Sequence, residues 1–426
     1  MSFYAEDRLG DGLVVAVEDI PYVRSVSVGV WVGVGSRQEP PHLAGVSHFV
    51  EHLLFKGTQR RTARQIAEEM DSIGGLLNGY TSKEYSCYYV KVLDEHLDRA
   101  MDLLSDLVLG PRFDAVDLTK EKGVILEEIK MYEDTPDELV GDLLAEAAWG
   151  RHPIGRPILG SERTVAGLAP EIVRAYHQAG YRQSNIVVAM AGNVKPEDGF
   201  GLARRYFASA PTAGGRAKAS APTFRPGFRR RTKGIEQVHL SLGFAGLALD
   251  DPGVYEFHLL AGVLGGGSSS RLFQSIREER GLAYSVFAYA SPFSDTGLLG
   301  VYAAVSPENV LEALRLAAAE IHKLCSDGPG AEELQRAKDQ AKASLLLGLE
   351  NTSNRMSRLG RSLLLLGRAP SPDEVAAKID AVTAESLTAL ARRVLQLPDA
   401  AVAAVGPKGL PSEEAMREAL AAGWSA

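Results

Sequence analysis

The sequence predicts an α+β protein in which one sandwich domain occurs twice. Segments that alternate like β-strands are interspersed with longer segments whose apolar residues recur at helical spacing. A chain of 426 residues is long enough for two or three domains. Residues 211–234 are rich in Ala, Pro, Gly and Arg, a composition typical of a linker. We therefore expect two homologous domains, 1–210 and 235–426, each with an antiparallel sheet packed against helices.

Three pairs of segments indicate that the second domain repeats the first. The paired segments are residues 25–33 with 239–247, 94–100 with 307–313, and 187–192 with 401–406. The offset is 213 or 214 residues in every pair. Because unrelated segments would share no common offset, this agreement favours a duplicated domain. The first and third pairs have the pattern of strands, and helices are expected at 97–109 and 310–324.

A short motif in the first copy has the composition of a metal site. Residues His48, Glu51 and His52 lie within the apolar run 45–55. On an α-helix these side chains project from one face, so two imidazoles can share an ion while the carboxylate stays beside it. Neutral imidazoles suit Zn²⁺, and the glutamate can take a proton from water on the ion. The alternative is a helix whose histidines are ordinary core or surface residues.

A catalytic zinc ion requires a third protein ligand and one open position. The segment 117–132 offers candidates, because it is rich in glutamate and its apolar residues fall at helical spacing. Glu121 and Glu128 are seven residues apart and stack on one inward face, which Val124 is expected to share. Glu127 points about 120° away from that face. We therefore assign Glu128 as the ligand and Glu121 as a carboxylate that orients a ligand. A solvated acidic helix is the alternative.

These segments resemble the pitrilysin-type zinc peptidases, a family that includes insulysin and the mitochondrial processing peptidase. The matching stretches are residues 45–58, with the order H-x-x-E-H, 77–84 and 124–129. In that family the third ligand lies 76 residues beyond the second histidine. The resemblance therefore implies that His48, His52 and Glu128 hold one Zn²⁺ per chain. It also implies that Glu51 is the general base and that Glu121 supports the site.

The resemblance further implies a place where the backbone of a peptide substrate binds. In the family, an edge strand pairs with the substrate. The corresponding residues are Asn78, Gly79, Tyr80, Thr81 and Ser82. Relatives often have alanine at the position of Gly79, but a contact made by backbone groups tolerates this change.

A second part of the resemblance lies in the other copy. A glycine-rich run, 265–273, is followed by Arg277 and Tyr284. The resemblance implies that this pair holds the substrate and stabilises the oxyanion that forms when water attacks an amide. Considered without the family, Arg277 would be a solvated helix residue and Tyr284 a packing residue.

The second copy has no metal motif of its own. The positions 214 residues beyond the motif are all glycine: Gly262, Gly265 and Gly266. The resemblance implies that this copy forms one wall of a closed chamber, and that the working unit contains four such domains. We therefore expect a homodimer, with Arg277 and Tyr284 of one subunit facing the zinc of the other. A heterodimer with a sibling subunit is the alternative.

Together these features predict a zinc-dependent endopeptidase that hydrolyses short or unfolded polypeptides. The alternative function is that of a catalytically inactive assembly subunit with the same fold, like the core proteins of the respiratory bc1 complex. Such subunits usually lack part of the metal set. This chain keeps the whole set, which favours the enzyme.

Charge and composition argue against several other classes of protein. A formal net charge of −8 disfavours nucleic acid as a main partner. The two cysteines, Cys87 and Cys325, argue against a disulfide framework and suit a reducing compartment. Neither a secretory signal nor an apolar stretch of membrane-spanning length is visible. A cytoplasmic location is therefore expected.

Overall fold

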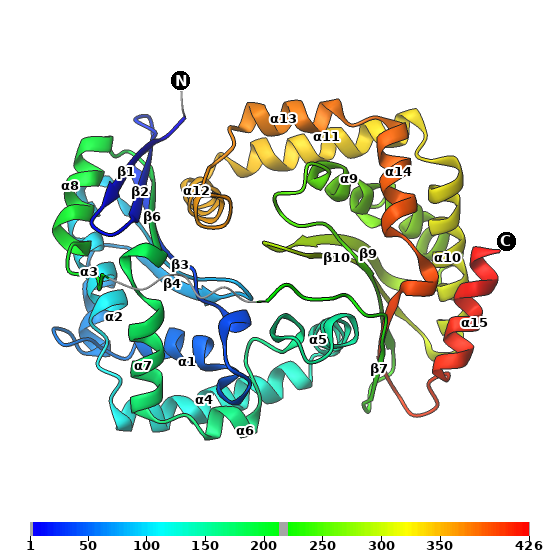
Figure 1. Ribbon diagram of the computed structural model, residues 1–426, viewed down its shortest axis with the longest axis horizontal. Helices are drawn as coiled ribbons and strands as arrows, with labels where there is room; N and C mark the ends of the chain where they lie inside the picture. Colours follow the sequence, from blue (N-terminus) through cyan, green and yellow to red (C-terminus); the bar gives the residue numbers. More distant parts are fainter. Residues whose placement is uncertain (1–2, 213–219, 426) are drawn as a thin grey trace. The chain divides into compact units, whose positions relative to one another are not determined.

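The computed structural model describes residues 3–212 and 220–425, and the chain divides into two compact units (Figure 1). The first unit comprises Met1–Lys130, Arg156–Ser220 and Leu346–Ser371. The second comprises Met131–Gly155, Ala221–Leu345 and Pro372–Ala426. Each unit has one β-sheet with apolar side chains buried on both of its faces.

The first unit is built on a six-stranded sheet. Its strands are β1 (Ala5–Leu9), β2 (Leu13–Asp19), β3 (Ser25–Val32), β4 (Leu76–Thr81), β5 (Ser86–Leu93) and β6 (Ile186–Gly192). Their order across the sheet is β1-β2-β6-β3-β5-β4. The β2 and β6 strands run parallel, and the other neighbouring pairs run antiparallel. Among the strands of the described residues, β4 therefore lies at the edge of the sheet and pairs only with β5.

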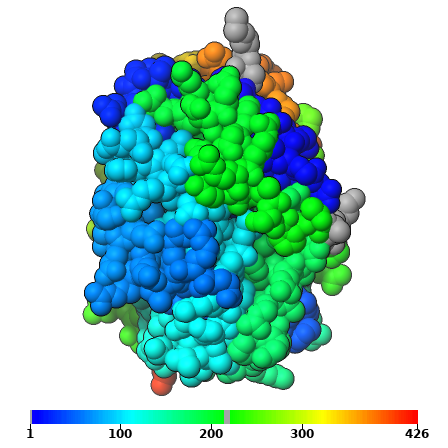
Figure 2. Space-filling view, turned by 90° about the vertical axis from the view of Figure 1, so that its left-hand side faces the viewer, coloured from blue at the N-terminus to red at the C-terminus, as the bar shows by residue number. Residues whose placement is uncertain are grey.

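Helices cover both faces of this sheet. They are α1 (Val46–Leu54), α2 (Ala63–Ser72), α3 (Leu97–Leu109), most of α4 (Ala115–Glu133), α6 (Glu162–Ala166), α7 (Pro170–Gly180), α8 (Pro196–Phe207) and α12 (Thr352–Leu366). The larger core forms between one face and the helices of the first half of the chain, with Val28 and Val30 of β3 at its centre. Figure 2 looks onto this layer, coloured blue to green. The α12 helix covers the other face, where Met356 packs against Trp31.

The second unit has a five-stranded sheet of similar design. Its strands are β7 (Phe228–Thr232), β8 (Val238–Ala245), β9 (Ala283–Pro292), β10 (Gly297–Val305) and β11 (Ala401–Gly406), in the order β7-β11-β8-β10-β9. Its helices are α5 (Pro136–Trp149), α9 (Val254–Gly265), α10 (Val310–Asp327), α11 (Ala331–Gly348), α13 (Pro372–Ala381), α14 (Ala384–Val394) and α15 (Glu413–Trp424). Among the described residues of the chain, no helix is long and apolar enough to cross a membrane.

Apart from β1, the first sheet has the same topology as the second, which confirms the predicted fold of two homologous sheet-and-helix domains. In the first, β3 lies between β6 and β5; in the second, β8 lies between β11 and β10. Each sheet contains one parallel pair, β2 with β6 and β7 with β11. The edge strands β4 and β9 occupy equivalent positions. The repeated segments of the sequence therefore correspond to repeated structural elements.

The units are not the contiguous ranges 1–210 and 235–426, because the two halves exchange one helix each. The α5 helix comes from the first half but packs on β8 and β11 of the second unit. The α12 helix comes from the second half but packs on β3 and β6 of the first. An apolar helix face is visible in a sequence, whereas the sheet that it covers is not. This is why the pattern alone favours contiguous domains.

The predicted linker, 211–234, also differs in part from a plain connector. Residues 213–219 lie outside the described part of the chain. Further along, Phe228–Thr232 form β7, which runs parallel to β11 at the edge of the second sheet. The three arginines of β7 suit an edge position, because charged side chains there discourage pairing with other chains. Arg229 also forms an ion pair with Glu146 of α5, with 2.9 Å between Nε and Oε1.

The close contact between α12 and the first sheet can be tested by mutation. Gly360 lies so close to the Trp31 indole that a Cβ atom would overlap it. We predict that Gly360→Ala lowers the unfolding free energy by about 1–3 kcal/mol, the usual cost of overpacking a core. The matched control is Gly201→Ala in α8, an exposed helical glycine with nothing near its Cβ position. That change should stabilise by about 0.5–1 kcal/mol. Urea unfolding of both variants measures the contrast, and equal stabilisation would contradict it.

Candidate metal centre

The α1 helix presents the histidine motif, and its first turn is anchored by a buried carboxylate. Gly45 precedes the helix with a φ of +94° and has no side chain to cap it. Glu39 takes this role, because its carboxylate oxygens accept hydrogen bonds from the backbone N–H groups of Gly45 at 2.8 Å and Ser47 at 2.7 Å. Burial raises the pKa of Glu39 to about 7, although these hydrogen bonds oppose the shift. Its anionic form also interacts favourably with the helix dipole.

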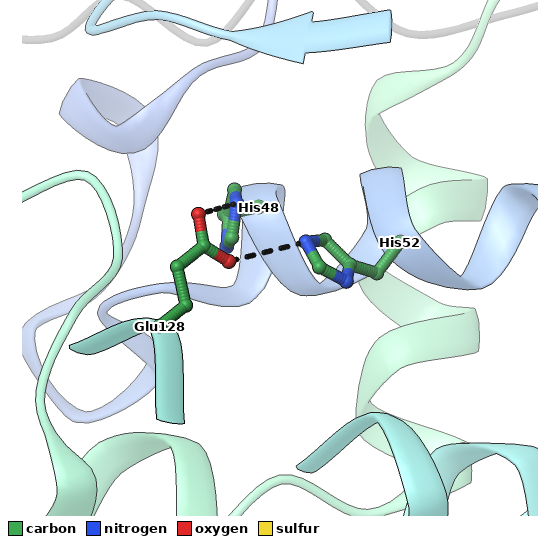
Figure 3. Close-up of side chains that lie close together, drawn as sticks. All are labelled: His48, His52 and Glu128. Carbon is green, nitrogen blue, oxygen red and sulfur yellow. Dashed lines mark ion pairs between the residues drawn. The ribbon is translucent and has the colours of Figure 1, made fainter. Parts of the chain in front are cut away.

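Three side chains converge on one point between α1 and α4 (Figure 3). His48 Nε2 lies 3.6 Å from Glu128 Oε1, and His52 Nε2 lies 3.4 Å from Glu128 Oε2. One potential ligand atom from each residue falls within 4.8 Å of the others. In a tetrahedral zinc site with bonds near 2 Å, ligand atoms are about 3.3 Å apart. The distances from Glu128 to the two histidines are therefore close to those in a tetrahedral zinc site.

Burial and neighbouring groups determine the charge of each of the three side chains. Burial, and then the neighbouring His52, lower the pKa of His48 to about 4, so this imidazole is neutral near pH 7. The contact between His48 and Glu128 is therefore not an ion pair, and both groups are potential metal ligands. Burial lowers the pKa of His52, yet hydrogen bonds to Glu128 and Glu121 outweigh this and raise it. The contact with His52 lowers the pKa of Glu128, which keeps that carboxylate ionised.

Glu121 contacts the ring nitrogen of His52 that faces away from the cluster. Its buried Oε2 atom accepts a hydrogen bond from His52 Nδ1 at 3.1 Å, and its Oε1 atom lies 2.9 Å from Lys56 Nζ. Glu121 accepts this hydrogen bond only when Nδ1 carries the proton, so in the neutral ring the contact leaves the Nε2 lone pair of His52 free for a metal. Among the described residues, His48 Nδ1 has no equivalent partner.

Glu51 lies beside the cluster but is not one of the three converging groups. One of its oxygens, Oε2, accepts a hydrogen bond from Thr81 Oγ1 at 2.6 Å. Burial raises the pKa of this carboxyl group, and the bond to Thr81 counteracts part of the rise. A carboxylate with a raised pKa is a stronger base than a free glutamate. The sequence reasoning missed the contact with Thr81, because the two residues are distant in the sequence.

The neighbouring residues of α4 lie away from the cluster. Glu127 is 74% exposed and pairs with Lys130, with 2.7 Å between its Oε1 and the lysine Nζ. Val124 was expected on the inward face, and this expectation is wrong, because the residue is 49% exposed. Its place on the helical wheel is about 60° from Glu121, on the side away from the buried Ile125. The inward face of α4 is therefore narrower than its sequence pattern suggests.

Comparisons with known proteins match most of the chain to one family. Residues 14–162 match "Insulinase (Peptidase family M16)", and residues 168–341 match "Peptidase M16 inactive domain". The chain belongs to peptidase family M16. The recognition of this family from sequence motifs is thereby confirmed.

M16 proteins of similar length include zinc proteases from several bacteria. The "uncharacterized zinc protease YmxG" of Bacillus subtilis is 43% identical over 94% of this chain and 98% of its own length. An "uncharacterized zinc protease" of Mycobacterium tuberculosis is 42% identical, over 94% of this chain and 92% of its own. The fold resembles that of an M16 inactive-domain protein from Pseudomonas fluorescens, with a TM-score of 0.90, 21% identity, and coverage of 96% and 99% of the two chains.

The second unit of the M16 chain carries the other predicted pair. Arg277 lies on η6 (Phe273–Glu278), a short π-helix, and Tyr284 lies on the edge strand β9. The guanidinium carbon of Arg277 is 4.8 Å from the centre of the Phe273 ring and 5.6 Å from that of Tyr284. Tyr284 is 75% exposed and borders a cavity of about 530 Å³. The pair is therefore assembled within one unit, and Tyr284 is accessible to a ligand.

The predicted substrate-binding residues lie along β4, with one exception. Asn78, Gly79, Tyr80 and Thr81 belong to the strand. Ser82 lies just beyond its end, in a turn where its N–H donates to the Tyr85 carbonyl at 2.8 Å. The strand ends there because the chain reverses into β5. The N–H of Gly79 is bonded to the side chain of Asn78, with 2.8 Å to Oδ1.

The contact between Glu121 and His52 provides a test of the metal centre. We predict that Glu121→Gln weakens zinc binding by about 10- to 100-fold, because His52 loses the carboxylate that selects its tautomer. The matched control is Glu127→Gln, which removes the same charge from an exposed position of the same helix. Competition with a fluorescent chelator measures both affinities. A similar loss in the two variants would indicate a general charge effect and contradict the assignment.

Proposed function

We propose that this chain is a zinc-dependent endopeptidase that hydrolyses short or unfolded polypeptides. The convergence of His48, His52 and Glu128, with Glu51 beside them and outside the ligand set, supports this function best. A structural zinc site would be closed by a fourth protein ligand. Within the described residues, the cluster contains three ligand groups. This arrangement favours catalysis over a purely structural role.

The residues have distinct tasks in the proposed reaction. His48, His52 and Glu128 would hold the ion. Zinc, when bound, supplies a Lewis acid that polarises water and the scissile carbonyl. Glu51 would remove a proton from the attacking water and then donate it to the leaving amine, so that water and an amide become an acid and an amine. The raised pKa of Glu51 suits a group that must both accept and release a proton.

The edge strand β4 supports binding of substrate as an added strand. Its backbone is paired with β5 on one side only, so the other side can accept an extended chain. Binding through backbone groups recognises extended polypeptides of many sequences. This mode of recognition suits short or unfolded substrates.

The second unit would complete the site in a dimer. Arg277 and Tyr284 carry donors that could stabilise an oxyanion, and this unit lacks a metal motif. We therefore propose a homodimeric chamber in which the pair from one subunit serves the zinc of the other; a sibling subunit could take the partner's place. The proposal includes a cytoplasmic location, because both cysteines, Cys87 and Cys325, are free and buried.

The base assignment leads to the central prediction. Glu51→Gln should keep about one zinc per chain but cleave a quenched peptide about 10²- to 10⁴-fold more slowly, the usual contribution of a positioned base. A chelator should abolish cleavage by the unmodified protein, and zinc should restore it. Metal analysis and peptide fluorescence measure the two quantities. Zinc binding without any chelator-sensitive cleavage would favour the inactive assembly subunit instead, and full turnover by Glu51→Gln would exclude its role as base.

The shared site can be tested with two inactive variants. Glu51→Gln and Arg277→Ala should each lose activity alone. If the pair acts across the dimer, random subunit exchange restores up to about a quarter of the active sites, because half the dimers are mixed and each has one intact site. Mixed dimers are verified with two different affinity tags. No recovered activity in verified mixed dimers would show that each chain serves its own zinc.

A further inference from the structure

The carboxylate of Glu51 is hydrogen-bonded by Thr81, through its hydroxyl and also through its backbone. Thr81 Oγ1 donates to Oε2 at 2.6 Å, the short distance typical of a hydroxyl bound to a charged acceptor. A glutamate side chain on its own can adopt several rotamers, and a hydrogen bond to one oxygen restricts them. This bond therefore restricts the position of the Glu51 carboxylate beside the cluster.

Thr81 is well placed for this task because its surroundings are rigid. It pairs with Ser86 of β5, whose hydroxyl donates to the Val34 carbonyl at 2.9 Å. The turn that follows is bonded to a neighbouring loop, where the N–H of Ser36 donates to the Ser82 carbonyl at 3.1 Å. This arrangement fixes the end of β4 at which Thr81 lies.

A buried ion pair further anchors the same turn. Arg37 Nη1 lies 2.8 Å from Glu84 Oε1, and both side chains are almost fully buried. The backbone N–H of Arg37 also donates to the Lys83 carbonyl at 2.7 Å. Breaking such a buried pair is costly, so the turn keeps its position. The hydroxyl of Thr81 is thus presented to Glu51 from a fixed backbone.

Thr81 also faces the open edge of the sheet with its backbone. In an antiparallel ladder, successive residues direct their N–H and C=O groups to opposite sides. Ser82 directs its N–H toward the β5 side, because it donates to the Tyr85 carbonyl. By alternation, Thr81 and Gly79 direct theirs to the unpaired side. The bond from the Gly79 N–H to the Asn78 side chain agrees with this assignment.

We propose that Thr81 is the positioning residue for Glu51: its hydroxyl holds one carboxylate oxygen, while its backbone forms part of the edge that receives the substrate. The inference rests on the proposed peptidase function. It links substrate binding to catalysis, because the residue that pairs with an added strand also orients the base. Displacement of the Thr81 backbone would disturb both.

The test removes the hydroxyl and keeps the shape. Thr81→Val is isosteric and suits a β-strand, so the sheet should form normally. We expect kcat to fall by about 10- to 100-fold, the effect of a misplaced reacting group, with KM, zinc affinity and melting temperature nearly unchanged. Thr81→Ser, which retains the hydroxyl, should recover most of kcat. A purely structural role would instead change the melting temperature and would not separate valine from serine.

A double-mutant cycle shows whether Thr81 acts through Glu51. Thr81→Val should have almost no further effect on the residual activity of Glu51→Gln, because the group that it positions is already lost. An equal loss of activity in both backgrounds would overturn the proposal. So would an unchanged kcat in Thr81→Val when the unmodified protein cleaves. If the unmodified, zinc-loaded protein cleaves no peptide, the proposed function itself fails, and this inference fails with it.

Discussion

The candidate metal centre depends on two helices that bury their apolar faces in one core. The α1 helix contributes Phe49, Val50 and Leu53 to the core of the first unit, and α4 contributes Ile125 and Ile129. Once these faces are buried, the polar sides of the two helices must meet beside the sheet. The imidazoles of α1 and the carboxylates of α4 are brought together for this reason. The binding geometry therefore results from the packing of apolar residues that take no part in binding.

The same packing determines the electrostatics of the site. Burial makes an isolated charge costly, so each ionisable group there either loses its charge or has a partner. His48 remains neutral, whereas His52 lies between two carboxylates. A divalent cation bound there would balance the negative charge of these carboxylates. At the start of α1, Glu39 stabilises the first helical turn, on which His48 lies.

The two units share a similar sheet topology but carry different sets of functional side chains. The second unit has glycines where the first has its motif, and it presents Arg277 and Tyr284 at the start of its own edge-strand region. Each sheet is covered on one face by a helix from the other half of the chain: α12 covers the first sheet and α5 covers the second. Each unit therefore requires residues from both halves of the sequence. Independent folding of a simple N-terminal or C-terminal fragment is not expected on this basis.

The sequence by itself determined the duplicated fold, the family and the three residues that converge at the candidate metal centre. Periodicity and spacing are local properties, and they were enough to favour Glu128 over Glu127, since a helix places residues seven apart on one face. Tertiary structure decided the rest. The contact between Thr81 and Glu51, the Glu39 cap, the exposure of Val124 and the exchange of helices all depend on which surfaces pack together. Such contacts join residues far apart in the chain, and no local pattern records them.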